Sequence, residues 1–106
     1  MPFIAERFFR APIGNPLPLK ERVPKGVHYE LKKLYYDTAQ AVNVVNMQGL
    51  KRIVSASQIV FGTDFPWLTS AHHVKGITGS GVFSEAELRA IDGGNAVKIL
   101  PQYAGR

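Results

Sequence analysis

One stretch of this chain, residues 58–67, constrains the fold more than any other. Its apolar run Ile59-Val60-Phe61 is typical of a strand that is buried on both faces. A Gly-Thr pair ends that run, and the carboxylate of Asp64 follows directly, before the turn Phe65-Pro66-Trp67. In parallel α/β proteins, the groups that bind and react lie at the carboxyl ends of the strands. We therefore predict a strand over residues 58–62, with Asp64 at the end where chemistry takes place.

A second strand and a helix precede this stretch. The aromatic-rich residues 34–38 predict a short strand, and Asn43 can cap a helix over residues 44–54. The unit from Asp37 to Asp64 has about the 30 residues that are usual for a strand, a helix and a second strand. Such a connection joins parallel strands, so we expect these two strands to be parallel.

The sequence before residue 34 predicts less regular structure. A helix is expected near residues 2–10, followed by a Pro/Gly-rich loop over residues 11–26 that contains too many breakers for regular structure. One or two helical turns are expected over residues 27–33. A loop this long usually belongs to a lid, an insertion or a crossing segment.

The sequence after Trp67 predicts three short helices, each with a local start signal. The first begins at Thr69 or Ser70 and ends at Gly76. The second begins at the capping box of Ser84 and Glu87, runs to Ile91 and stops at Asp92-Gly93-Gly94. The third is capped by Asn95, runs to Leu100 and ends before Pro101. Residues 76–81 are rich in glycine, but they do not lie between a strand and a helix and no Lys follows them. We therefore expect a flexible helix-to-helix connection there rather than a phosphate-binding loop.

The composition allows one domain and excludes several kinds of site. The chain has 106 residues, of which 45% are hydrophobic and 10% aromatic, enough for a modest core. The absence of cysteine excludes disulfides, thiolate catalysis and cysteine-ligated zinc. No apolar run approaches the roughly 20 residues needed to span a bilayer, and residues 1–10 lack a signal-like apolar core. We therefore expect a cytoplasmic protein without a membrane partner.

The net charge of +5 and the pI of about 9.8 raise the question of a nucleic-acid partner. Seven of the 13 basic residues lie in the first third of the chain: Arg7, Arg10, Lys20, Arg22, Lys25, Lys32 and Lys33. They are dispersed among Pro and Gly, they form no stripe, and no nucleic-acid-binding motif follows them. We therefore expect a solvated, slightly basic face and no nucleic-acid partner.

Asp64 is the first candidate for chemistry. A carboxylate at the end of a buried strand can ligate a divalent metal, or accept a proton from metal-bound water, whose pKa the metal lowers to about 7. The alternative is an Asp side chain that bonds its own turn before Pro66. Phe65 and Trp67 form either an apolar pocket wall over Asp64, which would bind substrate, or packing at the mouth of a barrel.

Asp37 lies at the matching end of the other predicted strand. A turn residue, a cap or a surface ion pair is the more ordinary interpretation of this carboxylate. Thr38 and Gln40 share the same edge and are weak candidates for lining a pocket.

The histidines are poor candidates for metal ligands. His72 and His73 are adjacent, so on a helix their side chains point about 100° apart and cannot both face one metal. We expect both of them, and His28 beside the Pro/Gly-rich loop, to be solvated or to act as caps.

Three segments of the chain together resemble a known family. QIVFGTDFPW, with LYYDTA before it and AIDGGNAVKILP after it, resembles the C-terminal end of the amidohydrolase-related proteins, the group that includes aminocarboxymuconate semialdehyde decarboxylase and the resorcylate-type decarboxylases. The opening MPFIAERF is similar to the helix that follows the sixth barrel strand in those proteins. The resemblance covers nearly all of the chain, and its most specific part is the strand end G-T-D-aromatic-P.

The resemblance implies a metal-dependent (β/α)8 barrel of which this chain holds the last two strand-helix units. Residues 34–38 would be strand seven. Asp64 would be the acid at the end of strand eight, which in this family ligates the catalytic metal, often zinc, or accepts and donates a proton. Gly94-Asn95-Ala96 would start the final helix, with a structural role for Asn95.

The departures from the family pattern matter as much. The paired histidines of the first strand and the histidines of the middle strands have no counterpart in this chain. Two parallel strands cannot shield both faces or close their own edges, and one carboxylate cannot hold a catalytic zinc. We therefore expect the C-terminal portion of a hydrolase or decarboxylase that acts on a small organic acid or a cyclic or aromatic substrate, inactive by itself. The alternative is a stand-alone, non-catalytic interaction module, a homodimer that buries the strand edges.

Overall fold

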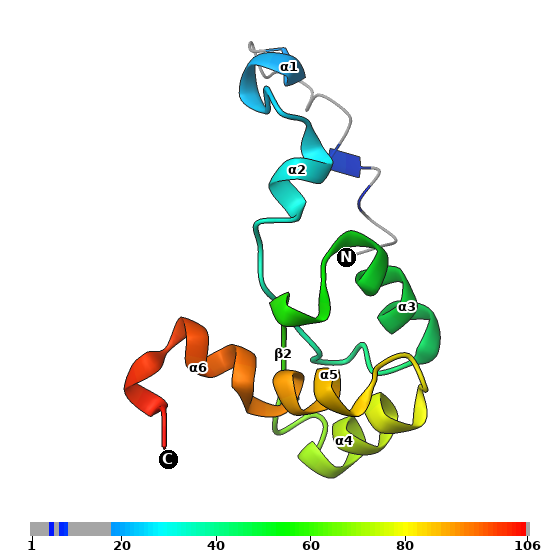
Figure 1. The fold of residues 1–106 in the computed structure, drawn as a ribbon. Helices are drawn as coiled ribbons and strands as arrows, with labels where there is room; N and C mark the ends of the chain where they lie inside the picture. Colours follow the sequence, from blue (N-terminus) through cyan, green and yellow to red (C-terminus); the bar gives the residue numbers. More distant parts are fainter. Residues whose placement is uncertain (1–4, 6, 9–17, 106) are drawn as a thin grey trace.

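The computed structural model describes residue 5, residues 7–8 and residues 18–105. Its sheet has two parallel strands among these residues, and the second, labelled β2, lies in the middle of the fold (Figure 1). β1 (Tyr36–Asp37) pairs with β2 (Ile59–Val60), so that Tyr36 lies opposite Ile59 and Asp37 opposite Val60. The parallel arrangement predicted from the sequence is therefore confirmed, and the described residues form a mixed α/β structure.

Both strands are shorter than predicted. The ladder covers two residues of each strand, whereas the sequence predicts strands over residues 34–38 and 58–62. Gln58 belongs instead to a 3₁₀ turn, η2 (Ala56–Gln58), and its side-chain amide donates to the carbonyl oxygen of Leu34 at 2.9 Å. At both ends of the ladder, side-chain hydrogen bonds join the two chains.

α3 (Val44–Ile53) connects the two strands, as predicted. The side chain of Asn43 caps this helix by accepting a hydrogen bond from the backbone N–H of Asn46 at 2.9 Å. Met47, Leu50 and Ile53 are buried, and their spacing of three residues places them on one side of the helix. The local cap and the apolar periodicity thus fix this element.

Among residues 18–35, α1 (Leu19–Arg22) and α2 (Val27–Leu31) are short helices. Both lie at the end of the molecule away from α4 (Ser70–Gly79) (Figure 1). α2 confirms the helical turns expected over residues 27–33. α1 corrects the expectation of irregular structure throughout residues 11–26, since residues 19–22 contain neither Pro nor Gly. Residues 11–17 of that loop, and most of the helix expected near residues 2–10, lie outside the described residues.

α4 (Ser70–Gly79) begins as predicted but ends later. The Thr69 hydroxyl caps it by accepting from the backbone N–H of His72 at 3.2 Å. The expected end at Gly76 is wrong, because Gly76 serves close packing rather than termination. A Cβ at this position would lie 2.6 Å from the carbonyl oxygen of Val42. The expected flexible connection over residues 76–81 is likewise wrong for its first four residues, which are helical.

The C-terminal helices are continuous rather than separate. α5 (Glu85–Arg89) passes through a π-helical turn, η3 (Ala90–Gly94), into α6 (Asn95–Ile99), and the 3₁₀ turn η4 (Pro101–Tyr103) follows. The predicted stop at residues 92–94 is therefore wrong.

The sequence predicted that Asn95 caps the last helix, but it is not a cap. Its backbone is helical, with φ −71° and ψ −40°, and its side chain is buried. Its Nδ2 donates to the carbonyl oxygens of Ala56 and Ile59, both at 2.7 Å. The wider π-helical turn before Asn95 contacts η2 and β2, so Asn95 ties the C-terminal helices to the second strand.

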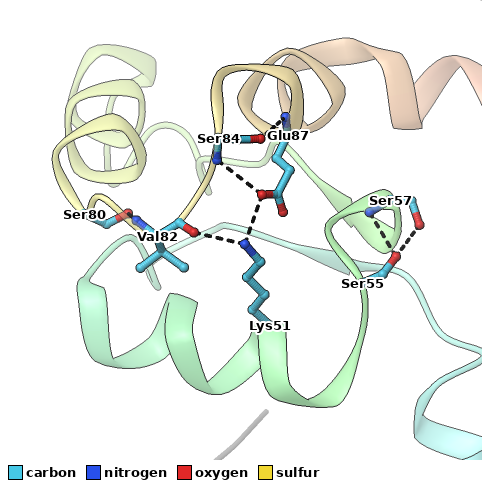
Figure 2. Close-up of polar contacts among 7 residues, drawn as sticks. All are labelled: Lys51, Ser55, Ser57, Ser80, Val82, Ser84 and Glu87. Carbon is cyan, nitrogen blue, oxygen red and sulfur yellow. Dashed lines mark hydrogen bonds and ion pairs between the residues drawn. The ribbon is translucent and has the colours of Figure 1, made fainter.

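The predicted capping box is present, and it is joined to α3 by a salt bridge (Figure 2). Lys51 of α3 places its Nζ 3.0 Å from Oε1 of Glu87 and donates to the carbonyl oxygen of Val82, also at 3.0 Å. The same Glu87 oxygen accepts from the backbone N–H of Ser84 at 3.2 Å. The hydrogen bond from Lys51 is the largest cause of a pKa of Glu87 below its ordinary value.

The buried core lies between α3, β2, α4 and the C-terminal helices. Its best-buried side chains are Met47, Ile59, Ile77 and Ile91. In the part of the chain that the structure describes, the sheet has two strands, so the (β/α)8 barrel stays a prediction. Over the same residues, none of the helices has the length and apolar character required to cross a membrane.

Candidate functional site

The carboxyl ends of β1 and β2 are joined by a reciprocal pair of hydrogen bonds. Thr38, which is fully buried, donates from Oγ1 to the carbonyl oxygen of Gly62 at 2.9 Å and accepts from the backbone N–H of Gly62 at 3.1 Å. Gly62 permits this approach, because a Cβ there would lie 3.0 Å from the Cβ of Asp37. The two chains therefore leave the sheet side by side at this edge.

Two residues beyond this tie, Gln40 and Asp64 meet. Nε2 of Gln40 donates a hydrogen bond to Oδ2 of Asp64. Both residues have positive φ, 55° for Gln40 and 59° for Asp64, a backbone conformation that is uncommon outside glycine. The Asp64 side chain thus bonds a residue 24 positions away in the sequence. In the turn that follows, the backbone N–H of Phe65 donates to Oγ1 of Thr63.

His73 of α4 contacts this pair through the backbone of Gln40. Its ring is fully buried, its Nδ1 lies 3.0 Å from the carbonyl oxygen of Thr69, and its Nε2 accepts from the backbone N–H of Gln40 at 3.1 Å. A nitrogen that accepts a hydrogen bond carries a lone pair, so the ring proton must be on Nδ1, where it bonds Thr69. The ring also meets that of Phe61 edge-on at 6.3 Å.

The expectation for the histidines is confirmed for two of the three. His72 is exposed, as predicted, whereas His73 is buried and is not a solvated or capping residue. The signal that could have found it is the spacing of four to Ile77, since the two share one helix face and both are buried. His28 is exposed on α2.

Asp37 behaves as a turn residue. Its Oδ1 accepts a hydrogen bond from the backbone N–H of Ala39 at 2.8 Å, as expected of a carboxylate in a turn. The carboxylate is exposed beside Gly62 and remains a neighbour of the Gln40–Asp64 pair rather than a member of it.

Phe65 and Trp67 extend from the edge beside Asp64. Their side chains are 78% and 77% exposed, so within the described residues neither packs the mouth of a barrel. A cis peptide bond joins Phe65 to Pro66. Two hollows of the described residues lie elsewhere: an open one of about 630 Å³ borders α3 and the turn after α4, and an apolar one of about 300 Å³ borders α1 and α2. Asp64, Phe65 and Trp67 line neither.

The described residues do not by themselves fit a catalytic zinc ion. Among them, no three His, Asp or Glu side chains come close enough together to hold a metal, whereas such a zinc takes three protein ligands. Asp64 offers one carboxylate, and both ring nitrogens of His73 are already engaged. A metal at this edge would need further ligands from outside the described residues.

Comparison of the chain with protein-family models, with curated proteins and with solved structures gives no match. The resemblance to the amidohydrolase-related proteins therefore remains an expectation from the motif, and the site is interpreted from its own geometry.

Proposed function

We propose that this chain is the C-terminal portion of a metal-dependent amidohydrolase-type hydrolase or carboxy-lyase, acting in the cytoplasm on a small organic acid or a cyclic or aromatic substrate. Asp64 would ligate the metal or transfer a proton, and the chain alone would be inactive. The observation that carries the proposal is the position of Asp64: it is exposed, it follows the end of a parallel strand, and Gln40 from the neighbouring strand end donates to it.

The chemistry open to Asp64 follows from its hydrogen bond. The Gln40 amide engages Oδ2, while a carboxylate has about four lone-pair sites on its two oxygens. Oδ1 therefore keeps its acceptor capacity, and because Asp64 is exposed, its carboxylate can face a cation or a reacting proton. A bound divalent metal would supply Lewis acidity or a water molecule that ionises near neutral pH.

The exposed aromatic rings support the kind of substrate. Phe65 and Trp67 lie one and three residues after Asp64, and both present most of their surface to solvent. Aromatic rings beside a polar group are typical of small-molecule sites, where they supply apolar contact. In a complete barrel, these two side chains would form a wall of the substrate pocket.

The shape of the molecule supports the proposal that further strands and helices of a barrel pack against this chain. The radius of gyration is 15.9 Å, whereas roughly 13 Å is expected for a compact domain of this length. Large hydrophobic side chains such as Leu34, Tyr35 and Val45 are also exposed. These surfaces are consistent with packing against strands and helices that the described residues do not contain.

Expression of the gene together with the in-frame DNA upstream of Met1 tests the proposal. The longer product should release carbon dioxide from hydroxybenzoates, or hydrolyse small cyclic esters or amides, and a chelator should abolish this turnover until Zn²⁺ is added back. The 106-residue chain serves as the inactive control. An upstream stop codon without a companion chain, or turnover that survives the chelator, would contradict the proposal.

A second candidate is a non-catalytic interaction module that pairs with a copy of itself. The exposed rings of Phe65 and Trp67 favour it, because aromatic residues are enriched at protein interfaces. Sedimentation analysis of the chain separates the candidates: a monodisperse dimer that Trp67→Ser dissociates would favour this module, and a monomer would exclude it.

A further inference from the structure

We propose that His73 is a positioning residue that orients Asp64 through Gln40. The chemical meaning of this inference rests on the function proposed above, in which Asp64 acts at the metal centre. The carbonyl oxygen of Thr69, the His73 ring, the Gln40 backbone and side chain, and Asp64 form one continuous series of hydrogen bonds. The series runs from the start of α4 to the carboxyl edge of the sheet.

The first step concerns the backbone of Gln40. Its φ of 55° lies in the left-handed region, which a residue other than glycine adopts only where its surroundings hold it. The backbone N–H of Gln40 points to Nε2 of His73 at 3.1 Å, and the next N–H, of Ala41, returns to the carbonyl oxygen of Thr38 at 3.1 Å. His73 is fully buried, so its ring is held in a fixed place beside this N–H.

The second step concerns the tautomer of the ring. Nε2 can accept from Gln40 only while the ring proton is on Nδ1, and the carbonyl oxygen of Thr69 holds that proton there at 3.0 Å. Thr69 is also the residue whose hydroxyl caps α4. The helix start thus determines which nitrogen of His73 faces the sheet edge.

The third step concerns the side chain of Gln40. Its Nε2 donates to Asp64, and the reach of that amide depends on the left-handed turn at its own Cα. If the turn opened, the amide would move away and the Asp64 carboxylate, which is exposed, would rotate freely. A buried ring that merely fills space would not have this effect, since it would lack the acceptor at Nε2. The acceptor is therefore the property to test.

Nuclear magnetic resonance on the isotope-labelled 106-residue chain tests the inference without any substitution. A coupling across the N–H···N hydrogen bond between the Gln40 amide nitrogen and Nε2 of His73 is expected, together with the ring proton on Nδ1. Absence of the coupling, or a ring proton on Nε2, would overturn the inference. This arm does not depend on whether any variant folds.

Substitutions then separate positioning from filling. His73→Phe keeps a planar ring but removes the acceptor, so the three-bond coupling that reports φ of Gln40 should change and the Gln40 side-chain amide should lose its contact with Asp64. His73→Gln carries an amide oxygen that reaches about as far from the backbone as Nε2, and it should restore both signals. His72→Phe, on the exposed neighbour, is the matched control and should alter neither. Unchanged Gln40 signals in a folded His73→Phe variant would overturn the inference.

The two proposals fail in different ways. If the N–H···N coupling is present but Asp64→Asn leaves turnover of the longer gene product intact, the proposed function is wrong and the hydrogen-bonded series stands. If the coupling is absent, His73 does not position Asp64, whatever the turnover.

Discussion

Gln40 and Asp64 are joined side chain to side chain across the carboxyl ends of two parallel strands, and both have a left-handed backbone. The contact depends on the residue two positions before each of them. Thr38 and Gly62 exchange hydrogen bonds and so bring the strand ends together. Left-handed conformations of non-glycine residues cluster at functional sites, where neighbouring structure maintains them. Here the observed geometry motivates the functional proposal for Asp64.

Gly76 and Gly79 lie on the same helix but should respond to alanine with opposite signs. At Gly76 the new Cβ would lie 2.6 Å from the carbonyl oxygen of Val42, so Gly76→Ala should lower the free energy of unfolding by about 1–3 kcal/mol. At Gly79 nothing lies within 4 Å of the new Cβ, and Gly79→Ala should raise it by about 0.4–1 kcal/mol. Urea denaturation of both variants measures this. Equal effects would mean that α4 does not pack against Val42 as described.

Asn95 should contribute to stability through its two buried donors. Asn95→Ala leaves the carbonyl oxygens of Ala56 and Ile59 without that amide, which should cost about 2–3 kcal/mol of unfolding free energy. Asn95→Asp is nearly isosteric but places a carboxylate against two carbonyl oxygens, so it should cost at least as much. A cost below about 0.5 kcal/mol for Asn95→Ala, typical of an exposed residue, would show that the C-terminal helices are not tied to β2 in this way.

The salt bridge in Figure 2 should make stability depend on pH in the acid range. The pKa of Glu87 is lowered in the folded chain, first by the hydrogen bond from Lys51, so the unfolded chain binds the proton more readily. The contribution of this carboxylate is therefore complete above its ordinary pKa of 4.5 and is lost as the pH falls through the lower folded pKa. Glu87→Gln should cost roughly 0.2–1 kcal/mol at neutral pH, and the difference from wild type should shrink below pH 4.5.

Glu85→Gln is the control for that series. Glu85 occupies the same first turn of α5 but pairs with Arg89 at the longer distance of 3.7 Å, and its side chain is 92% exposed. Denaturation curves of the wild type and both variants between about pH 3 and pH 7 make the comparison. A pH-independent difference between Glu87→Gln and wild type would contradict the role given to Lys51.

Local signals in the sequence predicted local structure well. Asn43, Thr69 and Ser84 each begin a helix as expected, because an N-cap depends on hydrogen bonds within three residues. The parallel pair of strands was also predicted correctly. The apolar run before Asp64 indicates a buried strand, and the length of the connection between the strands requires them to be parallel. The strands proved shorter because their extent depends on partners, which the run itself does not specify.

The errors concern residues whose role is set by a distant neighbour. Gly76 was expected to end a helix, yet its contact is Val42, 34 positions earlier. Asn95 was expected to cap, yet its donors reach residues 56 and 59. His73 was expected to be solvated, yet it bonds Gln40. Residue type alone cannot reveal such contacts, because they arise only once the chain has folded.

The turnover of Asp64→Asn in the longer gene product, compared with that of Asp37→Asn, tests the central claim most directly. Both carboxylates are exposed at the same edge of the sheet, but only Asp64 is bonded to Gln40. Asp64→Asn should lower kcat by about 10²- to 10⁴-fold, the range typical of a lost acid-base group, with the circular dichroism spectrum unchanged, and Asp37→Asn should leave kcat within about threefold. Full activity of Asp64→Asn, or equal losses in the two variants, would contradict the account.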